Sequence, residues 1–589
     1  MDKPGFILVS QSSNILKNFV ILVWLVKRFI YSSVVGKFMV YIVKKKVKGR
    51  EYFYLRESRR EGKNVVSKDI AYLGKSRRGA EKKMSEILAS EKKGFKGSEI
   101  KKEMDKILSI DELATFCKRR GFVYPSGEIY GGLAGFWDYG PIGVELVNNI
   151  KREWWKFHVQ HREDMVGIDG SIITNPKVWE ASGHVESFVD VIVVNKKTGE
   201  KKKVDKHEVK GLGKEWEVKG EFNPMFMTKV GAIKEDSTEA YLRPETAQLI
   251  FADFKEVWEN ARLKLPAGIA QIGKAFRNEI SPREFLFRAR EFEQMEIEYF
   301  IAPGMSCPYI DEIRGIEIEI LSEEMQRRGE EKGEKMEIYG AWKKGVIKTD
   351  WHAYWLSEEL RWFIMLGANP DKFRARQHTS EERSHYASDT WDLEYKFPMG
   401  WRELQGFANR SNYDLSQHAK KSGKNFEVQA EKGNVLPEVV CEPSLGVGRA
   451  FLVFLFEAYG YDKERENVVL SLSPKIAPFK AAVFPLISKG EVLEMSREVF
   501  KELKEEFNVF FDKSGSIGRR YARQDEIGTP YCITIDSDSL KKKDVTIRDR
   551  DSTKQIRVKS KDLLGVLRGL LSEREGFEGA GKIVETRVK

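Results

Sequence analysis

Long hydrophobic runs are missing from this 589-residue chain. The one membrane-like stretch, Phe19 to Val26, has eight residues, whereas a helix that spans a bilayer needs about 20 apolar residues. A secretory signal would also need a small-residue cleavage site after such a run, and none is evident. We therefore expect no stable insertion into a membrane.

Cysteine is scarce as well. The chain has four cysteines, Cys117, Cys307, Cys441 and Cys532, and no CxxC pair. Zinc ribbons need paired cysteines at short spacing, and disulfide frameworks need many more of them. We predict that these thiols are unpaired core residues, that the protein holds no zinc, and that it works in the reducing cytoplasm.

The positive charge is confined to one end of the chain. The formal net charge is +11, but residues 1–100 hold 23 Lys and Arg against 9 Asp and Glu, and the remainder holds 78 against 81. A nearly neutral body therefore carries a basic appendage. With 41% hydrophobic residues, the body has the composition of a globular enzyme, and the length suggests about three or four domains.

The basic appendage divides into three segments. Residues 1–38 are interpreted as an apolar and basic leader, either interfacial or disordered. Residues 39–75 predict a small basic β-meander of three strands broken at Gly49 and Gly62, and residues 76–104 a charged helical linker. The aromatic residues of the meander, Tyr52 to Tyr54, could stack on RNA bases or form a small core, and both interpretations stay open.

Common nucleotide-binding motifs are absent from the body. Gly74-Lys75-Ser76 is no phosphate-binding loop, because Asp69 stands where the leading glycine is required. Three other stretches combine arginines and carboxylates in an unusual way: Tyr241–Gln248, Phe276–Phe300 and Glu442–Arg449.

Each of these stretches has a structural interpretation. Residues 290–298 alternate like a strand, which places Glu296 and Glu298 on one face, and a turn before them predicts a hairpin. A salt-bridged surface hairpin is the alternative if this stretch is taken alone. Gly446 and Gly448 lead into a helix with Arg449 in its first turn, where a polyphosphate binds well.

Together these stretches resemble the three signature motifs of class II aminoacyl-tRNA synthetases, and in detail the homodimeric glycyl-tRNA synthetases, over roughly residues 105–565. Further matching stretches are Gly121–Gly135, Trp137–Pro141, Ser182–Glu186, Phe222–Phe226 and Trp401–Gly406. The resemblance implies an α+β fold with an antiparallel sheet flanked by helices in a catalytic domain at 105–465, with an insertion at about 302–350. It also implies an α/β anticodon-binding domain at 466–565, a tail at 566–589, and dimerisation near Pro176.

The resemblance also implies roles for individual residues. Arg277 and Arg449 are the expected catalytic residues, which clamp the α-phosphate and the γ-phosphate, and Phe292 and Arg449 are expected on opposite faces of the adenine. The implied ATP site comprises Arg277, Asn278, Glu279, Phe287, Arg288, Phe292, Glu403, Leu404, Gly446, Gly448 and Arg449. The implied glycine site comprises Glu245, Glu293, Gln294, Glu296, Glu442 and Ser444.

Magnesium is the one expected metal, and it should bridge the ATP phosphates. Glu403 is the protein carboxylate best placed to bind it and Glu442 is the second, because this ion prefers few carboxylates plus phosphate oxygens. For tRNA, the resemblance implies contacts from Arg519, Arg520 and Arg523. Internal salt bridges of these arginines with Asp525 and Glu526 are an equal alternative.

The predicted reaction is the ATP-dependent activation of glycine and its transfer to tRNA(Gly) by a cytoplasmic homodimer. One alternative is a catalytically inactive, synthetase-like protein that binds nucleic acid. The other is a sister class II synthetase for proline, threonine or histidine. The N-terminal appendage is then either an auxiliary tRNA-binding arm or a segment without a role in the reaction.

Overall fold

The computed structural model describes two compact units, Met1–Ser109 and Ile110–Lys589. In the first it describes the backbone of five strands between residues 19 and 74, and in the remainder residues 108–584 except 189, 205–207, 232–236 and 385. The predicted linker at 76–104 lies outside the described residues.

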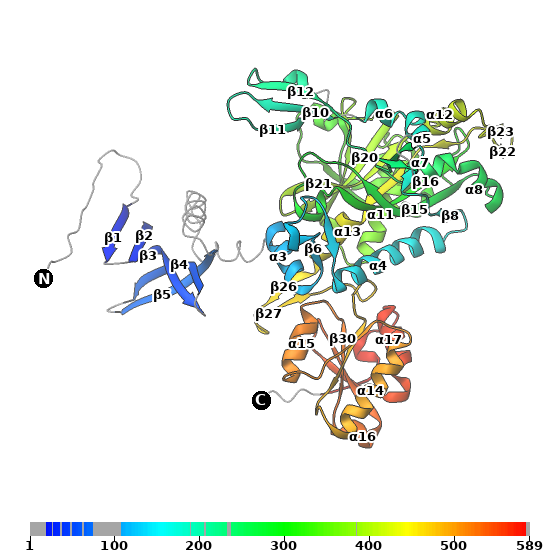
Figure 1. The fold of residues 1–589 in the computed structure, drawn as a ribbon. Coiled ribbons are helices and arrows are strands. Elements are labelled where there is room, and N and C mark those ends of the chain that lie inside the picture. Colours follow the sequence, from blue (N-terminus) through cyan, green and yellow to red (C-terminus); the bar gives the residue numbers. More distant parts are fainter. Residues whose placement is uncertain are drawn as a thin grey trace. The chain divides into compact units, whose positions relative to one another are not determined.

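The first unit holds a five-stranded antiparallel meander whose strands pair in chain order (Figure 1). The strands are β1 Phe19–Leu25, β2 Arg28–Val35, β3 Phe38–Val47, β4 Arg50–Glu61 and β5 Asn64–Gly74. The three strands predicted after residue 39 correspond to β3, β4 and β5. Strands β1 and β2 lie within the predicted leader at 1–38, where aromatic and β-branched residues favour a strand.

The second unit is built on a ten-stranded sheet, which is the predicted α+β catalytic architecture. Nine strands follow one path across it: β18 Glu334–Glu337, β17 Glu317–Leu321, β19 Phe373–Gln377, β20 Asp389–Phe397, β21 Gly400–Asn409, β25 Glu442–Gly446, β16 Glu291–Ile301, β15 Ala267–Phe276 and β8 Met165–Ile168. The tenth, β24 Glu438–Val439, pairs with β16. The predicted insertion contributes β17 and β18 to one end of the sheet.

The two faces of β16 differ in chemistry because alternate side chains point to opposite faces. Met295 and Ile297 are fully buried on the face that carries α13 and α4. Glu296 and Glu298 lie on the other face, where α7 packs. The main helices of the catalytic domain are α3 Ile110–Arg120, α4 Pro141–Trp155, α7 Ala247–Ala252, α8 Phe254–Ala261, α11 Asp350–Met365, α12 Tyr413–Ser422 and α13 Val447–Ala458.

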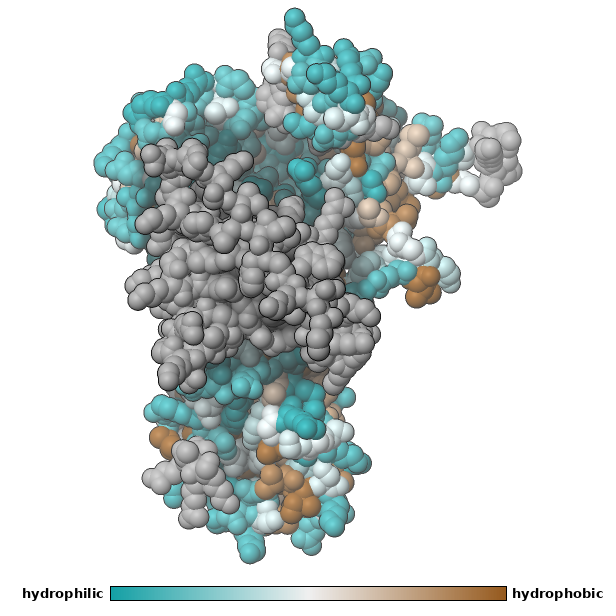
Figure 2. Space-filling model, turned by 90° about the vertical axis from the view of Figure 1, so that its left-hand side faces the viewer, coloured by the Kyte–Doolittle hydropathy of each residue, from teal (hydrophilic) through white to brown (hydrophobic). Residues whose placement is uncertain are grey.

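Smaller sheets surround this core. They are formed by β10 Asp190–Asn195 with β11 Lys201–Val204 and β12 Trp216–Phe222, by β9 Ile173–Thr174 with β13 Phe226–Val230 and β14 Thr238–Leu242, and by the hairpin of β26 Tyr459–Asp462 and β27 Asn467–Leu470. Among the residues that Figure 2 colours by hydropathy, hydrophilic ones predominate, and the hydrophobic ones lie in separate patches.

The C-terminal domain has a six-stranded mixed sheet with helices on it. Its elements are β28 Ala481–Pro485, β29 Val509–Phe511, β30 Tyr531–Ile535, β31 Asp544–Asp549, β32 Gln555–Lys559, β33 Lys582–Ile583, α14 Gly490–Lys504, α15 Ile517–Asp525, α16 Ser537–Lys542 and α17 Leu563–Leu571. Helix α17 crosses the boundary expected at residue 565, because Leu567 and Leu570 belong to the hydrophobic core.

The four cysteines are unpaired and buried, as predicted. Within the part of the chain that the structure describes, every helix is too short or too polar to cross a membrane.

Candidate active site

A row of polar residues crosses the middle of the large sheet. Glu296 of β16 lies opposite Ser444 of β25, and Ser444 lies opposite Gly406 of β21. Ser444 donates a hydrogen bond to Glu296 Oε1 at 2.6 Å, and Gln294 Nε2 donates to Ser444 Oγ at 3.2 Å. A Cβ atom at Gly406 would meet nothing within 4 Å, so the sheet has open space beside it at this end of the row.

Glu245 joins this row from the loop between β14 and α7. Its Oε2 lies 3.2 Å from Nε2 of His184, and the next residue, Thr246, donates a hydrogen bond to Glu296 Oε2. Glu245 and Glu296 are both almost fully buried. The start of α7 therefore lies against the sheet and brings Glu245 close to Glu296. Both carboxylates were predicted from the sequence to bind glycine.

Arg410 organises the far side of the same pocket. It donates to both carboxylate oxygens of Glu442, at 3.0 and 3.1 Å, and to both oxygens of Asp414, at 2.7 and 2.9 Å. Only 1% of Arg410 is exposed. Sequence reasoning missed Arg410, Asp414 and His184, and it placed Glu298 on the same face as Glu296 without giving it a role. An arginine and an aspartate four residues apart, directly after a strand, was a usable signal.

The pocket holds more acidic groups than basic ones. Oxygen atoms of Glu296, Glu298 and Glu442 lie within 4.8 Å of one another. Burial raises the pKa of Glu442 to about 8, with help from Glu296 and Glu245 and against the effect of Arg410. Burial also raises the pKa values of Glu296 and Glu298. Such crowding of carboxylates favours a small cation as ligand.

Glu245 differs from its neighbours. Burial alone would raise its pKa, but the interactions with His184, Arg410 and Arg277 outweigh burial and lower the pKa well below the ordinary value. Glu245 therefore stays ionised at neutral pH, and it supplies a fixed negative charge to the pocket.

Two arginines flank the pocket. Arg277, directly after β15, donates through Nε to the Pro244 carbonyl at 2.9 Å, and its guanidinium lies 5.4 Å from the ring of Phe292. Arg449, in the first turn of α13, donates to Glu403 Oε1 at 2.9 Å and lies 4.7 Å from the ring of Phe287. The expected placement of Phe292 and Arg449 on opposite faces of the adenine stays a prediction.

The connection between β15 and β16 carries the other residues expected to bind ATP. Asn278 N donates to the Pro224 carbonyl at 2.7 Å, and Arg288 forms an isolated bridge with Arg283. Oε2 of Glu279 is buried and has no hydrogen-bond partner among the described residues. The remaining residues expected to bind ATP lie on other elements. Gly446 is the N-cap of α13, Gly448 lies in the first turn of that helix, and Leu404 of β21 is fully buried.

Two predicted assignments do not fit the geometry. Glu293 was expected to bind glycine, but it lies on the opposite face of β16 from Glu296 and pairs with Lys151 at 2.9 Å. Glu442 was expected as a second magnesium ligand, but Arg410 occupies both of its oxygens. Glu403 lies outside the one group of three potential metal ligands among the described residues, which is formed by Glu296, Glu298 and Glu442.

The three arginines expected to contact tRNA differ in burial and in their partners. Arg520 is 4% exposed and donates to the carbonyls of Pro485 at 2.6 Å and Gly515 at 2.8 Å. Arg523 donates through Nε to Asp512 at 3.0 Å. Arg519 is exposed. Arg520 therefore has few donors left for RNA, because it is buried against carbonyls of its own domain. Arg523 pairs with Asp512 but keeps 42% of its side chain exposed.

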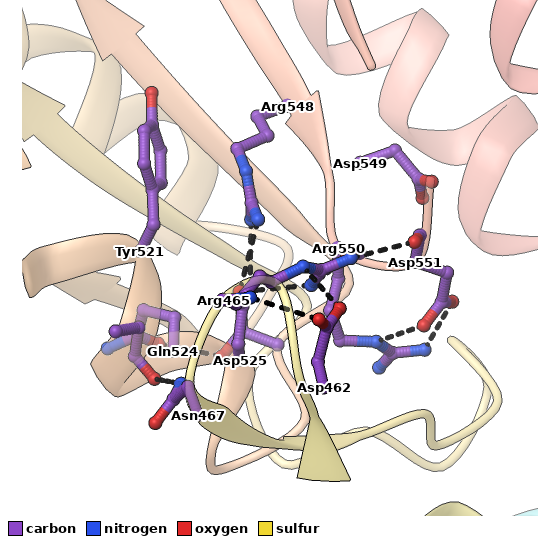
Figure 3. A network of polar contacts seen from close by, with 12 residues as sticks. Asp462, Arg465, Asn467, Tyr521, Gln524, Asp525, Arg548, Asp549, Arg550 and Asp551 are labelled. Carbon is purple, nitrogen blue, oxygen red and sulfur yellow. Dashed lines mark hydrogen bonds and ion pairs between the residues drawn. The ribbon is translucent and has the colours of Figure 1, made fainter. Parts of the chain in front are cut away.

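A buried polar network joins the two domains (Figure 3). Arg548 donates to both oxygens of Asp525, at 2.9 and 3.1 Å. Arg465, from the turn between β26 and β27, reaches Asp525 at 3.3 Å and the Arg550 carbonyl at 2.7 Å. Asp525 thus pairs with arginines other than those the sequence suggested, and it ties the C-terminal domain to the hairpin after α13.

Comparisons with known proteins agree with this geometry. Residues 226–456 match the tRNA synthetase class II core domain (G, H, P, S and T), and residues 480–570 match the anticodon binding domain. The glycine–tRNA ligase of Borrelia hermsii is 41% identical over 477 residues, which cover 78% of this chain and 97% of that protein.

Two further relatives have the same name. The glycine–tRNA ligase of Thermobifida fusca is 42% identical over 483 residues, which cover 76% of this chain and 95% of that protein. That of Geobacillus thermodenitrificans is 41% identical over 514 residues, which cover 81% of this chain and all of that protein. With such identity over nearly the whole length of each relative, this chain belongs to the glycine–tRNA ligase family of class II aminoacyl-tRNA synthetases.

Proposed function

We propose that this protein activates glycine with ATP to form glycyl-adenylate and pyrophosphate, and then transfers glycine to the 3′ end of tRNA(Gly). The observation that carries this proposal is the buried, hydrogen-bonded cluster of Glu245, Thr246, Glu296 and Ser444, with Arg277 and Arg449 near it. A cluster rich in carboxylates beside two arginines suits a zwitterionic amino acid next to a polyphosphate.

The pocket holds the ammonium group of glycine. Ionised Glu245 and the Glu296–Ser444 pair lie on the sheet floor, and Gln294 lies beside them through its bond to Ser444. Glu442 lies near them, and with its pKa raised to about 8 its ionised form is favoured when the ammonium binds. The same side chains fill the space that a larger amino acid would need, and a steric clash rejects competitors more strongly than an extra contact could.

The first chemical step needs positioning and charge neutralisation rather than a base. A carboxylate oxygen of glycine attacks the α-phosphorus of ATP, the bond to the leaving pyrophosphate breaks, and Arg277 neutralises charge on both reactants. In the second step the hydroxyl of the terminal tRNA ribose attacks the glycyl carbonyl and AMP leaves. Glycine is already ionised at neutral pH, so the first step moves no proton.

The ATP site extends from Arg277 to Arg449. The unpartnered oxygen of Glu279 accepts from the adenine amino group, Phe292 lies against the base, and Arg449 meets the γ-phosphate. The site is completed by Asn278, Phe287, Arg288, Leu404, Gly446 and Gly448. Magnesium, when bound with ATP, neutralises phosphate charge; Glu403 fits it because this carboxylate lies beside Arg449 and is half exposed.

The C-terminal domain binds the anticodon region of tRNA(Gly), for which Arg519 is fully available and the partly exposed Arg523 is a second candidate. The N-terminal meander serves as an auxiliary RNA-binding arm, consistent with the basic excess of residues 1–100. We further propose a cytoplasmic homodimer whose contact includes the segment around Pro176.

Glycine-dependent exchange of pyrophosphate into ATP tests the proposal directly. We expect exchange with glycine and none above background with proline, threonine or histidine. Exchange with one of those amino acids would identify a sister synthetase. No exchange with any of them, combined with retained tRNA binding, would identify an inactive nucleic-acid-binding protein.

A further inference from the structure

A buried row of three polar side chains ends at the glycine pocket. Ser182 Oγ lies 2.8 Å from Nδ1 of His184, and Nε2 of His184 lies 3.2 Å from Glu245 Oε2. The three residues are 1%, 4% and 8% exposed. Gly183, between the first two, has a φ of 82°, which glycine adopts without the strain of a Cβ atom. The sequence Ser-Gly-His therefore turns the serine and the histidine toward each other, and each ring nitrogen has a partner.

The direction of the hydrogen bonds in this row follows from the available donors. Ser182 has one hydroxyl hydrogen, and its Oγ lies near both His184 Nδ1 and the Trp179 carbonyl, the latter at 3.3 Å. If the hydroxyl donates to Nδ1, the neutral ring carries its hydrogen on Nε2. If it donates to Trp179, a ring protonated on Nδ1 alone would turn a lone pair toward the Glu245 carboxylate, so both nitrogens must carry hydrogens. In both allowed states the N–H at Nε2 points to Glu245.

His184 is the side chain that sets the plane of the Glu245 carboxylate. The other oxygen, Oε1, lies 3.3 Å from Gln248 Nε2 and 4.0 Å from Arg410. Both of these groups approach Asp414 more closely, Gln248 at 2.8 Å and Arg410 at 2.7 Å. Of the three contacts, that of His184 is the shortest.

Asn223 holds the histidine from the backbone side. Its Nδ2 donates to the carbonyls of His184 and of the following residue, both at 3.2 Å. The carbonyl of Pro224 accepts from Asn278 N at 2.7 Å. The short helix α6 His184–Ser187 is therefore tied through two neighbouring residues to the loop after β15.

The same segment contacts Arg277. The ring of Phe188, the residue after α6, lies 5.5 Å from the Arg277 guanidinium, and the ring of Phe292 lies 5.4 Å from it. Arg277 Nε donates at 2.9 Å to the carbonyl of the residue before Glu245. Residues 182–188, which we call the α6 clasp, therefore contact both the carboxylate expected at the glycine ammonium and the arginine expected at the glycine carboxylate.

A serine, a histidine and a carboxylate in a row also occur in hydrolases, where the serine is the nucleophile and meets the substrate. In this protein the order relative to the pocket is reversed. Glu245 lies at the pocket, and Ser182 lies at the buried end with 1% of its surface exposed. The row therefore suits positioning rather than covalent catalysis.

We propose that the α6 clasp is a positioning element for the activation of glycine. His184 holds the plane of the Glu245 carboxylate against the ammonium group, and Phe188 holds the Arg277 guanidinium at the other end of the substrate. Because both contacts come from one short segment, the two groups keep a fixed separation that matches a small substrate. This inference rests on the proposed function, and it adds two positioning residues that act through Glu245 and Arg277.

The first test compares two amides at position 184 in the full chain. The amide nitrogen of His184→Gln reaches the place of Nε2 and donates to Glu245, whereas the amide of His184→Asn is too short. The KM for glycine in pyrophosphate exchange should rise about 10- to 100-fold in His184→Asn, the size of one hydrogen bond to a charged group. It should stay within about fivefold of the wild type in His184→Gln, and the KM for ATP should change less than about twofold in both. Equal KM values for glycine in the two variants would overturn the proposal.

His352 supplies the matched control. It is fully buried, and Thr349 Oγ1 lies 2.8 Å from its Nδ1, but its Nε2 has no hydrogen-bond partner among the described residues. His352→Asn should lower the melting temperature, as His184→Asn does, and leave the KM for glycine within about twofold of the wild type. A comparable rise of this KM in both variants would mean that the loss of a buried histidine is responsible, which contradicts the proposal.

The second test asks whether the two contacts act as one element. Phe188→Leu should lower kcat for exchange about 3- to 30-fold, because the Arg277 guanidinium loses one ring, and should change the KM for glycine less than about threefold. The rings of His184 and Phe188 lie 5.5 Å apart, so the double variant His184→Asn/Phe188→Leu should lose less kcat/KM than the product of the two single losses. A wild-type kcat in Phe188→Leu, or losses that multiply, would refute the clasp.

Failure of the clasp and failure of the proposed function give different results. A wild type without glycine-dependent exchange refutes the proposed function. Wild-type constants in His184→Asn and Phe188→Leu, beside an active wild type, refute the clasp alone. Because Phe188 is only partly buried, Phe188→Leu decides the matter if the variants at position 184 do not fold.

Discussion

Replacing Glu296 with glutamine should separate catalysis from stability. Glu296 accepts hydrogen bonds from Thr246 and Ser444, and in the proposed complex it faces the glycine ammonium. Leaving a buried charge without its partner costs about 3 to 5 kcal/mol. The kcat/KM for glycine in pyrophosphate exchange should therefore fall by roughly two to four orders of magnitude, while the KM for ATP changes little.

The thermal stability of Glu296→Gln, in contrast to its activity, should not decrease. Burial and the charge of Glu245 both raise the pKa of Glu296, so the ionised form of this side chain is unfavourable in the free protein. Glutamine removes that charge, and the hydroxyls of Thr246 and Ser444 can rotate to accept its amide hydrogens. We expect the melting temperature of Glu296→Gln to be equal to or above that of the wild type.

Glu293→Gln is the matched control, because Glu293 belongs to the same strand but faces Lys151 on the other side. Its loss should change the KM for glycine by less than about threefold, the usual limit for a partly exposed ion pair. Comparable losses in the two variants, or wild-type exchange in Glu296→Gln, would refute the assignment of Glu296 to the ammonium.

Three further outcomes are expected. Because the pKa of Glu442 is raised to about 8, ammonium binding should favour its ionised form, and the KM for glycine should fall as the pH rises from 6 to 8. Between pH 6 and 8, folding leads Glu442 to take up a proton, so the melting temperature of the free protein should decrease with rising pH. A KM for glycine and a melting temperature that both stay constant over this range would count against a raised pKa of Glu442. Arg520→Ala should cost about 2 to 4 kcal/mol in a denaturant titration, whereas Arg519→Ala should stay within about 0.5 kcal/mol and instead raise the KM for tRNA. Asp525→Asn should lower the melting temperature and the rate of aminoacylation, while glycine-dependent exchange stays within about twofold; equal losses in both assays would contradict a role confined to the domain junction.

The sequence predicts which strand carries the glycine site better than it predicts which side chains belong to it. Alternation in residues 290–298 correctly places Glu296 and Glu298 on one face, whereas the resemblance alone assigns Glu293 to that pocket. Residues three apart in a strand point to opposite faces. The two-residue period of the strand is therefore sufficient to separate Glu293 from the glycine site, and the resemblance is the weaker guide at this position.

Long-range partners are harder to predict. Arg410 binds Glu442, and His184 reaches Glu245, across 32 and 61 positions of sequence. Composition gives no signal for such pairs, because each depends on which loops the sheet brings together. The same holds for Arg520, where the sequence shows three arginines on one short helix but not that one of them points into its own domain.

The two faces of the β15–β16 hairpin carry different groups. One face carries Glu296, and the other carries Lys274 and Glu293, which border a hollow of about 680 Å³. Arg277 extends directly from the end of β15, and its Nε donates to the Pro244 carbonyl, one residue before Glu245. Pulling the hairpin away from the sheet would therefore displace Arg277 relative to Glu245. Such a displacement should lower kcat for exchange more than the affinity for ATP, because the chemical step depends on the position of Arg277.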